Sequence, residues 1–280
     1  MALPIVKWAG GKRQLLDHLI PRIPLHMARY VEPFAGGAAV FLAIADSANG
    51  TRHRHFEEAR LCDRNEELVV AYRTIAANVD GVIACLKKYR HDEAVFYETR
   101  ALDVAILSPE ERAARLIFLN KTCFNGLWRV NSKGHFNVPF GRYVNPTLCD
   151  EEGLRAAAPL FARASIDAHD FTESLTNLGP GDFVYFDPPY APVSETAFFT
   201  SYAKEGFGHG DQERLAHIFR SLSDRGVLCM LSNADTPLTR ALYKDFSIDV
   251  VEARRSVNSK ATKRGNVQEI IVTSWAPPQP

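Results

Sequence analysis

The strongest restriction on the fold of this chain comes from a strand that leads through a tight glycine turn into a helix. Residues 30–32 read as a strand end, Pro33-Phe34-Ala35-Gly36-Gly37 as a tight turn, and 38–45 (AAVFLAIA) as the start of a helix. A second short strand at 59–62 ends at Asp63, 27 positions after Gly36. An acidic side chain at such a place can accept hydrogen bonds from both ribose hydroxyls of a nucleoside. The pattern predicts an α/β fold that binds a nucleoside cofactor.

The second half of the chain returns to the same alternation. Strand patterns cover 164–167, 182–186, 227–231 and 267–275, and a helical pattern covers 211–224. The run at 182–186 is continuously apolar, as in strands that are buried on both faces of a sheet. We therefore expect the α/β sheet to resume there.

Between these two parts the strand pattern stops. Ser108-Pro109-Glu110-Glu111 is a helix start, with serine as N-cap, proline in the first turn and glutamate three residues after the cap. The helix runs into FNGLWRVNSKG at 124–134, which is rich in turn formers and mixes aromatic with basic residues. The sequence predicts an inserted subdomain at about 71–156.

Composition limits the class of protein. The 280 residues include 33 basic and 33 acidic side chains, and the longest charge-free apolar run, 33–45, is too short to span a bilayer. The five cysteines form no C-x-x-C pair, and the nine histidines do not fall at ligand spacing beside them. No secretory signal opens the chain. We expect a cytoplasmic protein without a membrane anchor, a disulfide framework or a metal.

Two stretches carry basic side chains and no acid. Each holds five lysine or arginine residues, at 115–143 and at 253–268. Such stretches favour a phosphate backbone as partner, and two solvated basic faces remain the alternative.

The tetrapeptide Asp187-Pro188-Pro189-Tyr190 directly follows the buried strand, where open α/β sheets bind their ligands. The prolines fix the backbone, so the aspartate and the Pro188 carbonyl can accept hydrogen bonds from an aromatic amine while Tyr190 stacks on its ring. Two acceptors on the N–H bonds would stabilise the positive charge that develops when the amine attacks. A proline-terminated strand with an ordinary turn is the alternative.

These segments together resemble the Dam-like DNA adenine methyltransferases, over nearly the full length of the chain. The resemblance rests on segments in a fixed order: KWAGGK (7–12), VEPFAGG (31–37), CDRNEEL (62–68), FNGLWRVN (124–131), FNVPFGRY (136–143), Asp170-Phe171, DPPY, SNADTP (232–237) and the closing basic segment before QEIIVTS (268–274). The family implies a Rossmann-like S-adenosylmethionine methyltransferase sheet with a helical target-recognition insert. On this basis 1–70 and 157–280 form the catalytic domain and 71–156 the DNA-binding insert.

The resemblance also implies roles at the two substrates. The methyl donor, S-adenosylmethionine, would be bound by Trp8, Lys12, Phe34, Gly36, Asp63, Asp170 and Phe171, with Asp187 bordering it. Asp187, Pro188, Pro189 and Tyr190 would hold the target adenine, with no metal involved. Core packing is the alternative for Trp8 and Phe171. One departure concerns the glycine loop, where Ala38 replaces the family's last glycine.

Double-stranded DNA would have to release the target adenine into the DPPY pocket by base flipping. The residues expected at the DNA are Lys7, Lys121, Phe124, Asn125, Leu127, Arg129, Lys133 and Pro139. Phe124 would wedge into the duplex, and Arg129 would read guanine in the major groove. Core packing of Phe124 and phosphate binding by Arg129 and Lys133 remain the alternatives. The resemblance suggests GATC as the site, although Lys121 and Trp128 depart from the expected residues.

Two further segments are expected near the substrates: 256–266 along the DNA and 199–207 as a closing loop. The rival functions are methylation of the cytosine 4-amino group, of another adenine site or of a glutamine amide, and DNA binding without catalysis. Asp187 argues against cytosine and glutamine enzymes, which commonly resemble S-P-P-Y and N-P-P-Y. A monomer suits the family, and a dimer is the alternative. The sequence leaves open whether the enzyme acts beside a restriction nuclease, alone in the cell or for a phage.

Overall fold

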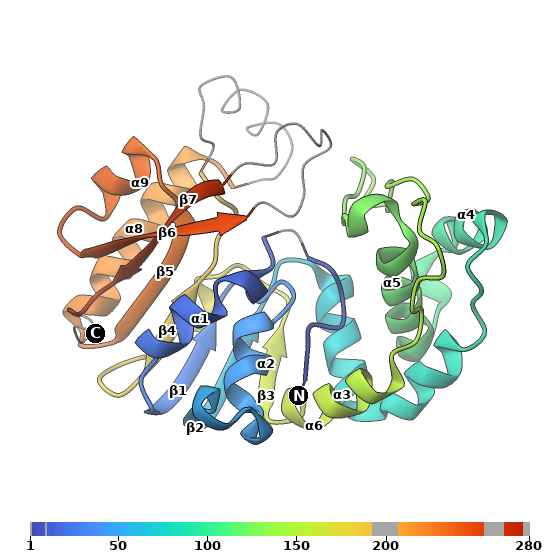
Figure 1. Cartoon of the computed structure of the whole chain (residues 1–280), viewed down its shortest axis with the longest axis horizontal. Helices are drawn as coiled ribbons and strands as arrows, with labels where there is room; N and C mark the ends of the chain where they lie inside the picture. Colours follow the sequence, from blue (N-terminus) through green and yellow to red (C-terminus); the bar gives the residue numbers. More distant parts are fainter. Residues whose placement is uncertain (1, 9, 192–206, 255–265, 277–280) are drawn as a thin grey trace. The chain divides into compact units, whose positions relative to one another are not determined.

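The computed structural model describes residues 2–8, 10–191, 207–254 and 266–276. The strands in this part of the chain form one seven-stranded sheet in the order β3-β2-β1-β4-β5-β7-β6 (Figure 1). They are β1 (His26–Glu32), β2 (His55–Cys62), β3 (Ala164–Asp167), β4 (Phe183–Phe186), β5 (Leu228–Ala234), β6 (Ser247–Arg254) and β7 (Asn266–Thr273). β4 is parallel to β1 and β5, and β7 is antiparallel to β5 and β6. The order 3-2-1-4-5 is that of a Rossmann-like fold, so the predicted fold class is confirmed.

The helices agree with the predicted alternation and add to it. They are α1 (Leu16–Leu19), α2 (Ala39–Ala45), α3 (Glu66–Leu86), α4 (Glu93–Ala101), α5 (Pro109–Thr122), α6 (Glu151–Phe161), α8 (His209–Asp224) and α9 (Pro237–Leu242). α5 begins with the predicted capping box, because Ser108 Oγ accepts from the Glu111 amide and Glu111 accepts from the Ser108 amide.

The chain divides into two compact units. Unit 1 contains Met1–Arg13, Ala35–His53 and Leu61–Asp170, and unit 2 contains Gln14–Phe34, Arg54–Arg60 and Phe171–Pro280. Residues 199–206 and 256–265, on which two of the expectations fall, lie outside the described residues.

Unit 1 is built around α3, which lies beside α5 and α6 (Figure 1). α3 is long and apolar enough to cross a membrane by length and composition alone. Its apolar side chains, Leu68, Tyr72 and Ile83 among them, are buried within the unit. They are the core of the helical layer, which explains the apolar composition.

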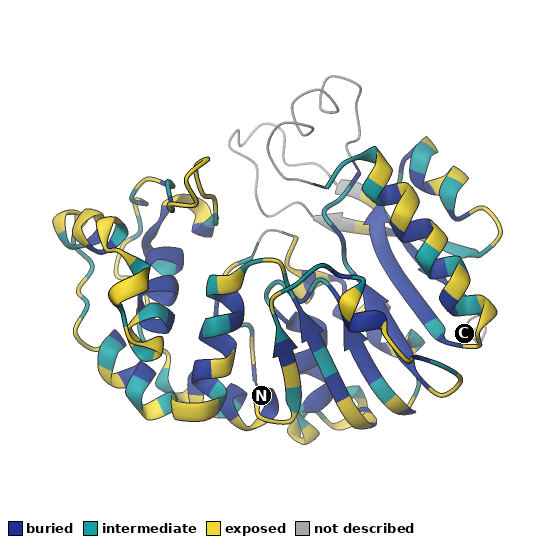
Figure 2. Ribbon diagram, turned by 180° about the vertical axis from the view of Figure 1, so that it is seen from behind, coloured by how far each residue is buried: buried dark blue, intermediate teal, exposed yellow. Residues whose placement is uncertain are grey.

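Unit 2 has its core between the sheet and α8. All four residues of β4 are buried, and Phe186 packs with Phe219 of α8. Figure 2 shows β4 and nearly all of β5 as buried ribbons, whereas α8 alternates buried and exposed residues. Gly226, at φ +81°, makes the left-handed turn that leads from α8 to β5. This arrangement places the carboxyl end of β4 directly before Asp187.

Candidate active site

The glycine turn in unit 1 has no room for a side chain. Gly36 has φ +46°, and a Cβ there would lie 2.8 Å from Cδ1 of Trp8. The half-buried indole of Trp8 therefore packs directly on the turn. Ala38, where the family pattern has glycine, also adopts the left-handed conformation at φ 51° and is the N-cap of α2. Alanine at this position therefore adopts the left-handed conformation that glycine adopts most readily.

Asp63, at the end of β2, is tied to the glycine turn. Its Oδ2 accepts from the Gly36 amide at 2.9 Å and its Oδ1 from the Asn65 amide at 2.8 Å. Tyr72 of α3 donates its hydroxyl to the Gly36 carbonyl at 2.7 Å. A carboxylate has about four lone-pair sites, so two amide contacts leave acceptor capacity for hydroxyls. Burial raises the pKa of Asp63, and the two amide hydrogen bonds oppose that shift.

Lys12 and Asp170 also lie in unit 1. Lys12 is buried, with its ammonium donating to the Gly10 carbonyl. Half-buried Asp170 follows His169, whose Nδ1 lies 2.9 Å from the Cys62 thiol next to Asp63. The Asp63 amide in turn donates to the carbonyl of Asp167 at 3.2 Å. The ends of β2 and β3 therefore hold Asp63 and Asp170, two of the three predicted donor-binding carboxylates, and a backbone hydrogen bond joins these strand ends.

Two predicted donor-binding aromatics meet in unit 2. The rings of Phe34 and Phe171 stack at 5.1 Å, and Phe207 meets Phe34 edge-on at 5.6 Å. The Arg214 guanidinium lies 4.8 Å from the Phe171 ring centroid. Phe171 is 2% exposed and belongs to the core of the unit, whereas Phe34 is half-buried. Phe34 thus presents more of its surface than Phe171 does.

A hydrogen-bond chain orients Asp187. Ser232 Oγ of β5 donates to Asp187 Oδ1 at 3.1 Å. Since that uses the only hydroxyl proton of Ser232, the contact of 2.8 Å between Tyr185 and Ser232 has the tyrosine as donor. Asp187 itself is half-buried, while Tyr185 is fully buried. The Asp187 carboxylate is therefore positioned by Ser232 of β5 directly and by Tyr185 of β4 through Ser232.

The rest of the DPPY loop is fixed from α8 and β5. Gln212 Nε2 donates to the Pro189 carbonyl at 2.9 Å, and the Ala191 amide donates to Asn233 Oδ1 at 3.1 Å. Gln212 and Asn233 are buried and joined to each other at 3.1 Å. Pro188 is buried and Pro189 half-buried. These hydrogen bonds fix the backbone of the loop at Pro189 and at Ala191.

Tyr190 is oriented by a second carboxylate. Its hydroxyl donates to Glu269 Oε2 of β7 at 2.7 Å. Burial raises the pKa of Tyr190 well above its ordinary value, and the charges of Asp187 and Glu269 add to the shift. The phenol stays protonated and its ring is held as a flat, neutral surface. Ser232 lies in the SNADTP segment that carried part of the resemblance; no sequence signal marks Gln212 or Glu269.

The structure brings together residues 124–131 and 136–143, which carry most of the residues expected at the DNA and which both belong to unit 1. The Phe124 amide donates to the Pro139 carbonyl at 2.9 Å, and the Asn137 amide donates to the Arg129 carbonyl at 3.0 Å. The Phe124 side chain is 43% exposed, which leaves its ring available and speaks against the alternative of a core phenylalanine. Asn125 is exposed with φ +56°, and Leu127 is half-buried. Phe124, Asn125, Arg129, Lys133 and Pro139 are all exposed.

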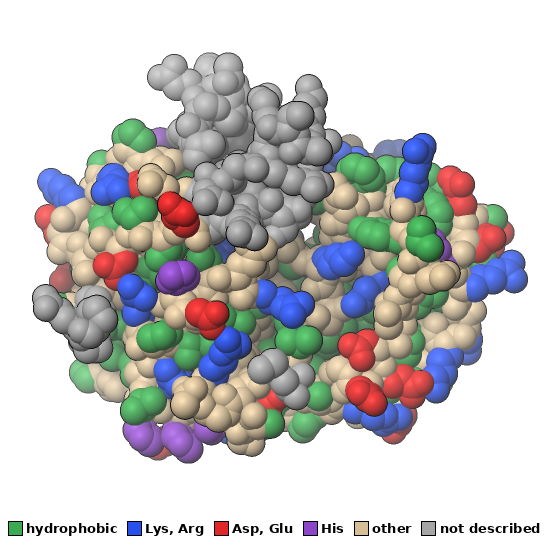
Figure 3. All heavy atoms as spheres, viewed as in Figure 1, with side chains coloured by type: hydrophobic (Ala, Val, Ile, Leu, Met, Phe, Trp, Pro, Cys, Tyr) green, Lys and Arg blue, Asp and Glu red, His purple; other side chains and the backbone are tan. Residues whose placement is uncertain are grey.

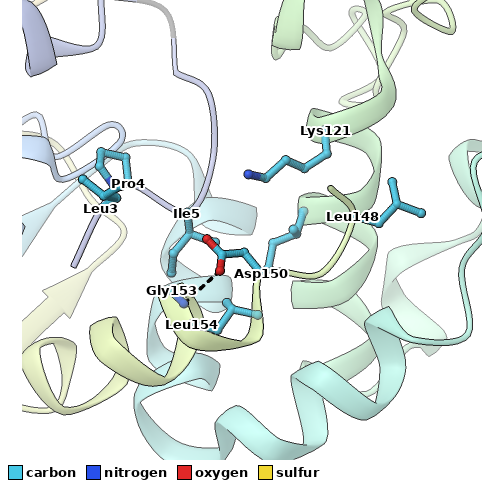
Figure 4. Close-up of a pocket in the computed structure, with 9 residues that line it drawn as sticks. Leu3, Pro4, Ile5, Lys121, Leu148, Asp150, Gly153 and Leu154 are labelled. Carbon is cyan, nitrogen blue, oxygen red and sulfur yellow. Dashed lines mark hydrogen bonds between the residues drawn. The ribbon is translucent and has the colours of Figure 1, made fainter. Parts of the chain in front are cut away.

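Lys7 and Lys121 have different surroundings. Exposed Lys7 places its ammonium 4.4 Å from the ring centroid of Tyr143. Half-buried Lys121 instead lines a small cavity between the N-terminal segment and α6 (Figure 4), where Asp150 caps α6 through the Gly153 amide. Burial lowers the pKa of Lys121, and Asp150 opposes the shift. Of the two lysines, Lys7 has the more accessible charge.

Two further features of this part of the molecule are the distribution of its surface charge and the placement of side chains that could bind a metal ion. Figure 3 shows basic and acidic side chains interspersed over the face drawn there, in keeping with the zero net charge. Among the described residues, no group of three or more His, Cys, Asp or Glu side chains is placed to hold a metal ion.

Comparison with known proteins gives the class of enzyme. This chain belongs to the D12 class N6 adenine-specific DNA methyltransferase family, whose profile matches residues 8–257. The predicted enzyme class is thus confirmed.

Curated relatives match almost end to end. The Type II methyltransferase M1.LlaDCHI of Lactococcus lactis subsp. cremoris is 41% identical, across 97% of this chain and 95% of its own. The Type II methyltransferase M.MjaIII of Methanocaldococcus jannaschii is 36% identical, across 97% and 99%. The DNA adenine methylase of Escherichia coli (strain K12) is 34% identical, across 95% and 93%.

Proposed function

We propose that this enzyme transfers the methyl group of S-adenosylmethionine to the 6-amino group of an adenine flipped out of duplex DNA, at GATC. The observation that carries the proposal is the DPPY loop, in which Asp187 is held by Ser232 and Tyr190 by Glu269. An acceptor for N–H groups next to a fixed aromatic ring suits an aromatic amine.

We assign the donor to residues of the glycine turn and of the ends of β2 and β3, with Phe34, Phe171 and Asp187 as further predicted contacts. Trp8 packs on the turn at Gly36, Asp63 accepts from the Gly36 amide, and Asp170 follows the end of β3. Lys12 is assigned to the donor by the resemblance. Phe34 belongs to the same turn, and Phe171 immediately follows Asp170. Asp63 would accept the ribose hydroxyls with the lone pairs that its two amide contacts leave. The residues present therefore fit a nucleoside-containing donor, with Asp187 at its border.

When bound, the donor supplies an electrophilic methyl group on a sulfonium. Asp187 and the Pro188 carbonyl would accept the two N–H bonds of the adenine amine, which favours the pyramidal, nucleophilic nitrogen. The N–C bond forms as the S–C bond breaks, and the nitrogen then loses one proton to Asp187 or to water. Tyr190 would stack on the adenine ring throughout.

On the DNA side, we propose that the insert at 71–156 binds the duplex while 1–70 and 157–280 form the catalytic domain. Phe124 would fill the space that the flipped adenine leaves, since its ring is exposed beside Pro139. Arg129 would contact guanine, and Leu127 with Pro139 would contact a thymine methyl. Lys7 and Asn125 would bind base edges or phosphates, and Lys133 would bind a phosphate. Lys121 is half-buried, and we assign it a phosphate contact.

We propose that the enzyme acts in the cytoplasm, as a monomer without membrane attachment. The Type II relatives favour pairing with a restriction nuclease.

The direct test compares Asp187→Ala with the wild-type enzyme. We expect labelled methyl transfer to duplex DNA to fall by at least about 10²–10³-fold, because the acceptor of the amine protons is lost. Donor affinity, measured by calorimetry, should change little. Asp245→Asn is the matched control, since Asp245 is half-exposed and pairs with Arg220 away from the DPPY loop. Activity of Asp187→Ala within about tenfold of the wild type would refute the role of Asp187.

A further inference from the structure

Asn120, near the end of α5, is a fully buried polar side chain that has no place in the site described so far. Its carboxamide makes three hydrogen bonds, all to backbone groups. Oδ1 accepts from the Lys7 amide at 2.8 Å, and Nδ2 donates to the carbonyls of Lys7 at 2.7 Å and Gly126 at 3.0 Å. Only a group that is both donor and acceptor can make this set.

The two segments that Asn120 joins are far apart in sequence, and both carry residues proposed at the DNA. Lys7 lies in the N-terminal segment, and Gly126 lies in the loop that presents Phe124, Asn125 and Leu127. All of them belong to unit 1. Asn120 therefore holds the two segments against each other.

Gly126 shows how closely the segments approach. It has φ +64°, and a Cβ there would lie 2.7 Å from both Cβ and Cδ of Lys7. The aliphatic stem of Lys7 thus packs on the backbone of the loop, while its ammonium lies over Tyr143. Any side chain at 126 would displace Lys7, the loop, or both.

We propose that Asn120 is a positioning residue for sequence recognition, which keeps Lys7 and the Phe124–Leu127 loop in one register toward the DNA. This inference rests on the proposed function. Asn120 does not contact DNA in this account; it fixes the groups that do. Loss of the Asn120 hydrogen bonds weakens the discrimination between base pairs. The attraction to the phosphate backbone depends on the charge of the protein and persists in a variant that keeps that charge.

The experiment measures discrimination by the full-length enzyme. The substrates are a duplex with the mapped recognition site and duplexes with one base pair of that site changed, and the readout is the ratio of kcat/KM values. The principal variant is Asn120→Asp, which keeps the acceptor for the Lys7 amide and loses both donor contacts. Gly126→Ala perturbs the same contact from the loop side.

Thr122→Val is the matched control. Thr122 is buried on the same helix, and its hydroxyl donates to the Phe118 carbonyl at 2.6 Å without any contact to Lys7. It reports what loss of a buried hydrogen bond on α5 does to stability and activity alone. Melting temperatures of all variants are measured in parallel.

We expect Asn120→Asp and Gly126→Ala each to lower the discrimination ratio by at least about tenfold. In the double variant, the loss of discrimination expressed as a free energy should be smaller than the sum of the two single losses, because both substitutions act on one contact. The salt dependence of DNA affinity should be unchanged in Gly126→Ala, which leaves the charge of the protein as it is. Thr122→Val should keep its discrimination ratio within about twofold of the wild type.

Two other sets of results would overturn the inference, and they can be told apart. If Asn120→Asp retains wild-type discrimination, or if Thr122→Val loses as much, the positioning role is wrong while the proposed function stands. If the wild-type enzyme transfers no methyl group to any duplex, the proposed function fails and this inference with it. Amide exchange at Lys7, faster in Asn120→Ala than in Thr122→Val, checks the contact independently of activity.

Discussion

The carboxylate of Asp63 is shared between the backbone and, in our account, the ribose of the donor. Protonation removes its charge and part of its acceptor capacity, so donor affinity must fall as Asp63 becomes protonated. Because burial raises the pKa of Asp63, this fall begins at a higher pH than an aspartate with the ordinary pKa would give.

We predict that the dissociation constant of S-adenosylmethionine rises as pH drops through the raised pKa of Asp63. Asp63→Asn should bind the donor about 10–100-fold more weakly at neutral pH, the usual effect of losing hydrogen bonds to a charged group, and with little dependence on pH. Calorimetric titration across pH checks both. Asp80→Asn, an exposed aspartate that pairs with Arg155, is the control. Wild-type affinity in Asp63→Asn would show that the ribose lies elsewhere.

Asp187 and Tyr190, which we propose to contact the target base, were predictable from the sequence, whereas Glu269 and Gln212, which position their loop, were not. Asp187 and Tyr190 stand in a compact motif after a buried strand, so their position follows from local pattern. Glu269 and Gln212 come from distant segments, and they reach the loop only because β7 pairs with β5 and α8 packs on the sheet. Such contacts depend on tertiary structure and leave no local signal.

The turn into α2 stores a small strain at Ala38. An L-residue in the left-handed conformation costs roughly 1–2 kcal/mol, and Ala38 is held there at φ 51° as the N-cap of the helix. Glycine pays no such penalty but has more freedom in the unfolded chain.

We predict that Ala38→Gly raises the free energy of unfolding by up to about 1 kcal/mol. Urea titration of the two proteins measures the difference directly. Ala43→Gly, in the interior of the same helix, should instead lower the free energy of unfolding by about 0.5–1 kcal/mol. Destabilisation by Ala38→Gly would mean that the buried methyl group outweighs the backbone strain.

The elements that sequence reasoning placed best are those with strong local signals. β3 matches the predicted 164–167, and α5 begins at its predicted capping box. β6 (Ser247–Arg254) was not predicted, because an edge strand needs only a weak apolar pattern and takes its order from pairing with β7. The boundaries of the insert, 71 and 156, stay a prediction.

Taken as a whole, the neutral chain must bind a polyanion through local rather than net charge. Exposed Arg129 and Lys133 both lie in the basic stretch, yet our account gives them different tasks. Arg129 Nε donates to Asn137 Oδ1 at 2.7 Å, which steadies the guanidinium as base readout requires.

We predict that Lys133→Ala weakens DNA binding evenly across sequences and lowers the slope of log affinity against log salt by about 1. Arg129→Ala should cost about 1–3 kcal/mol of discrimination at one base pair. Fluorescence anisotropy at several salt concentrations, on cognate and altered duplexes, separates the two. An even loss of affinity in Arg129→Ala would reassign that residue to the phosphates.

The central claim is methylation of adenine N6 within GATC. The most direct measurement incubates the enzyme with S-adenosylmethionine and unmethylated genomic DNA, and then maps modified bases by single-molecule sequencing. Our account predicts N6-methyladenine confined to GATC. N6-methyladenine in another motif would keep the chemistry and reject the assigned base contacts at Leu127, Arg129 and Pro139. Methylcytosine, or no modified base at all, would contradict the account.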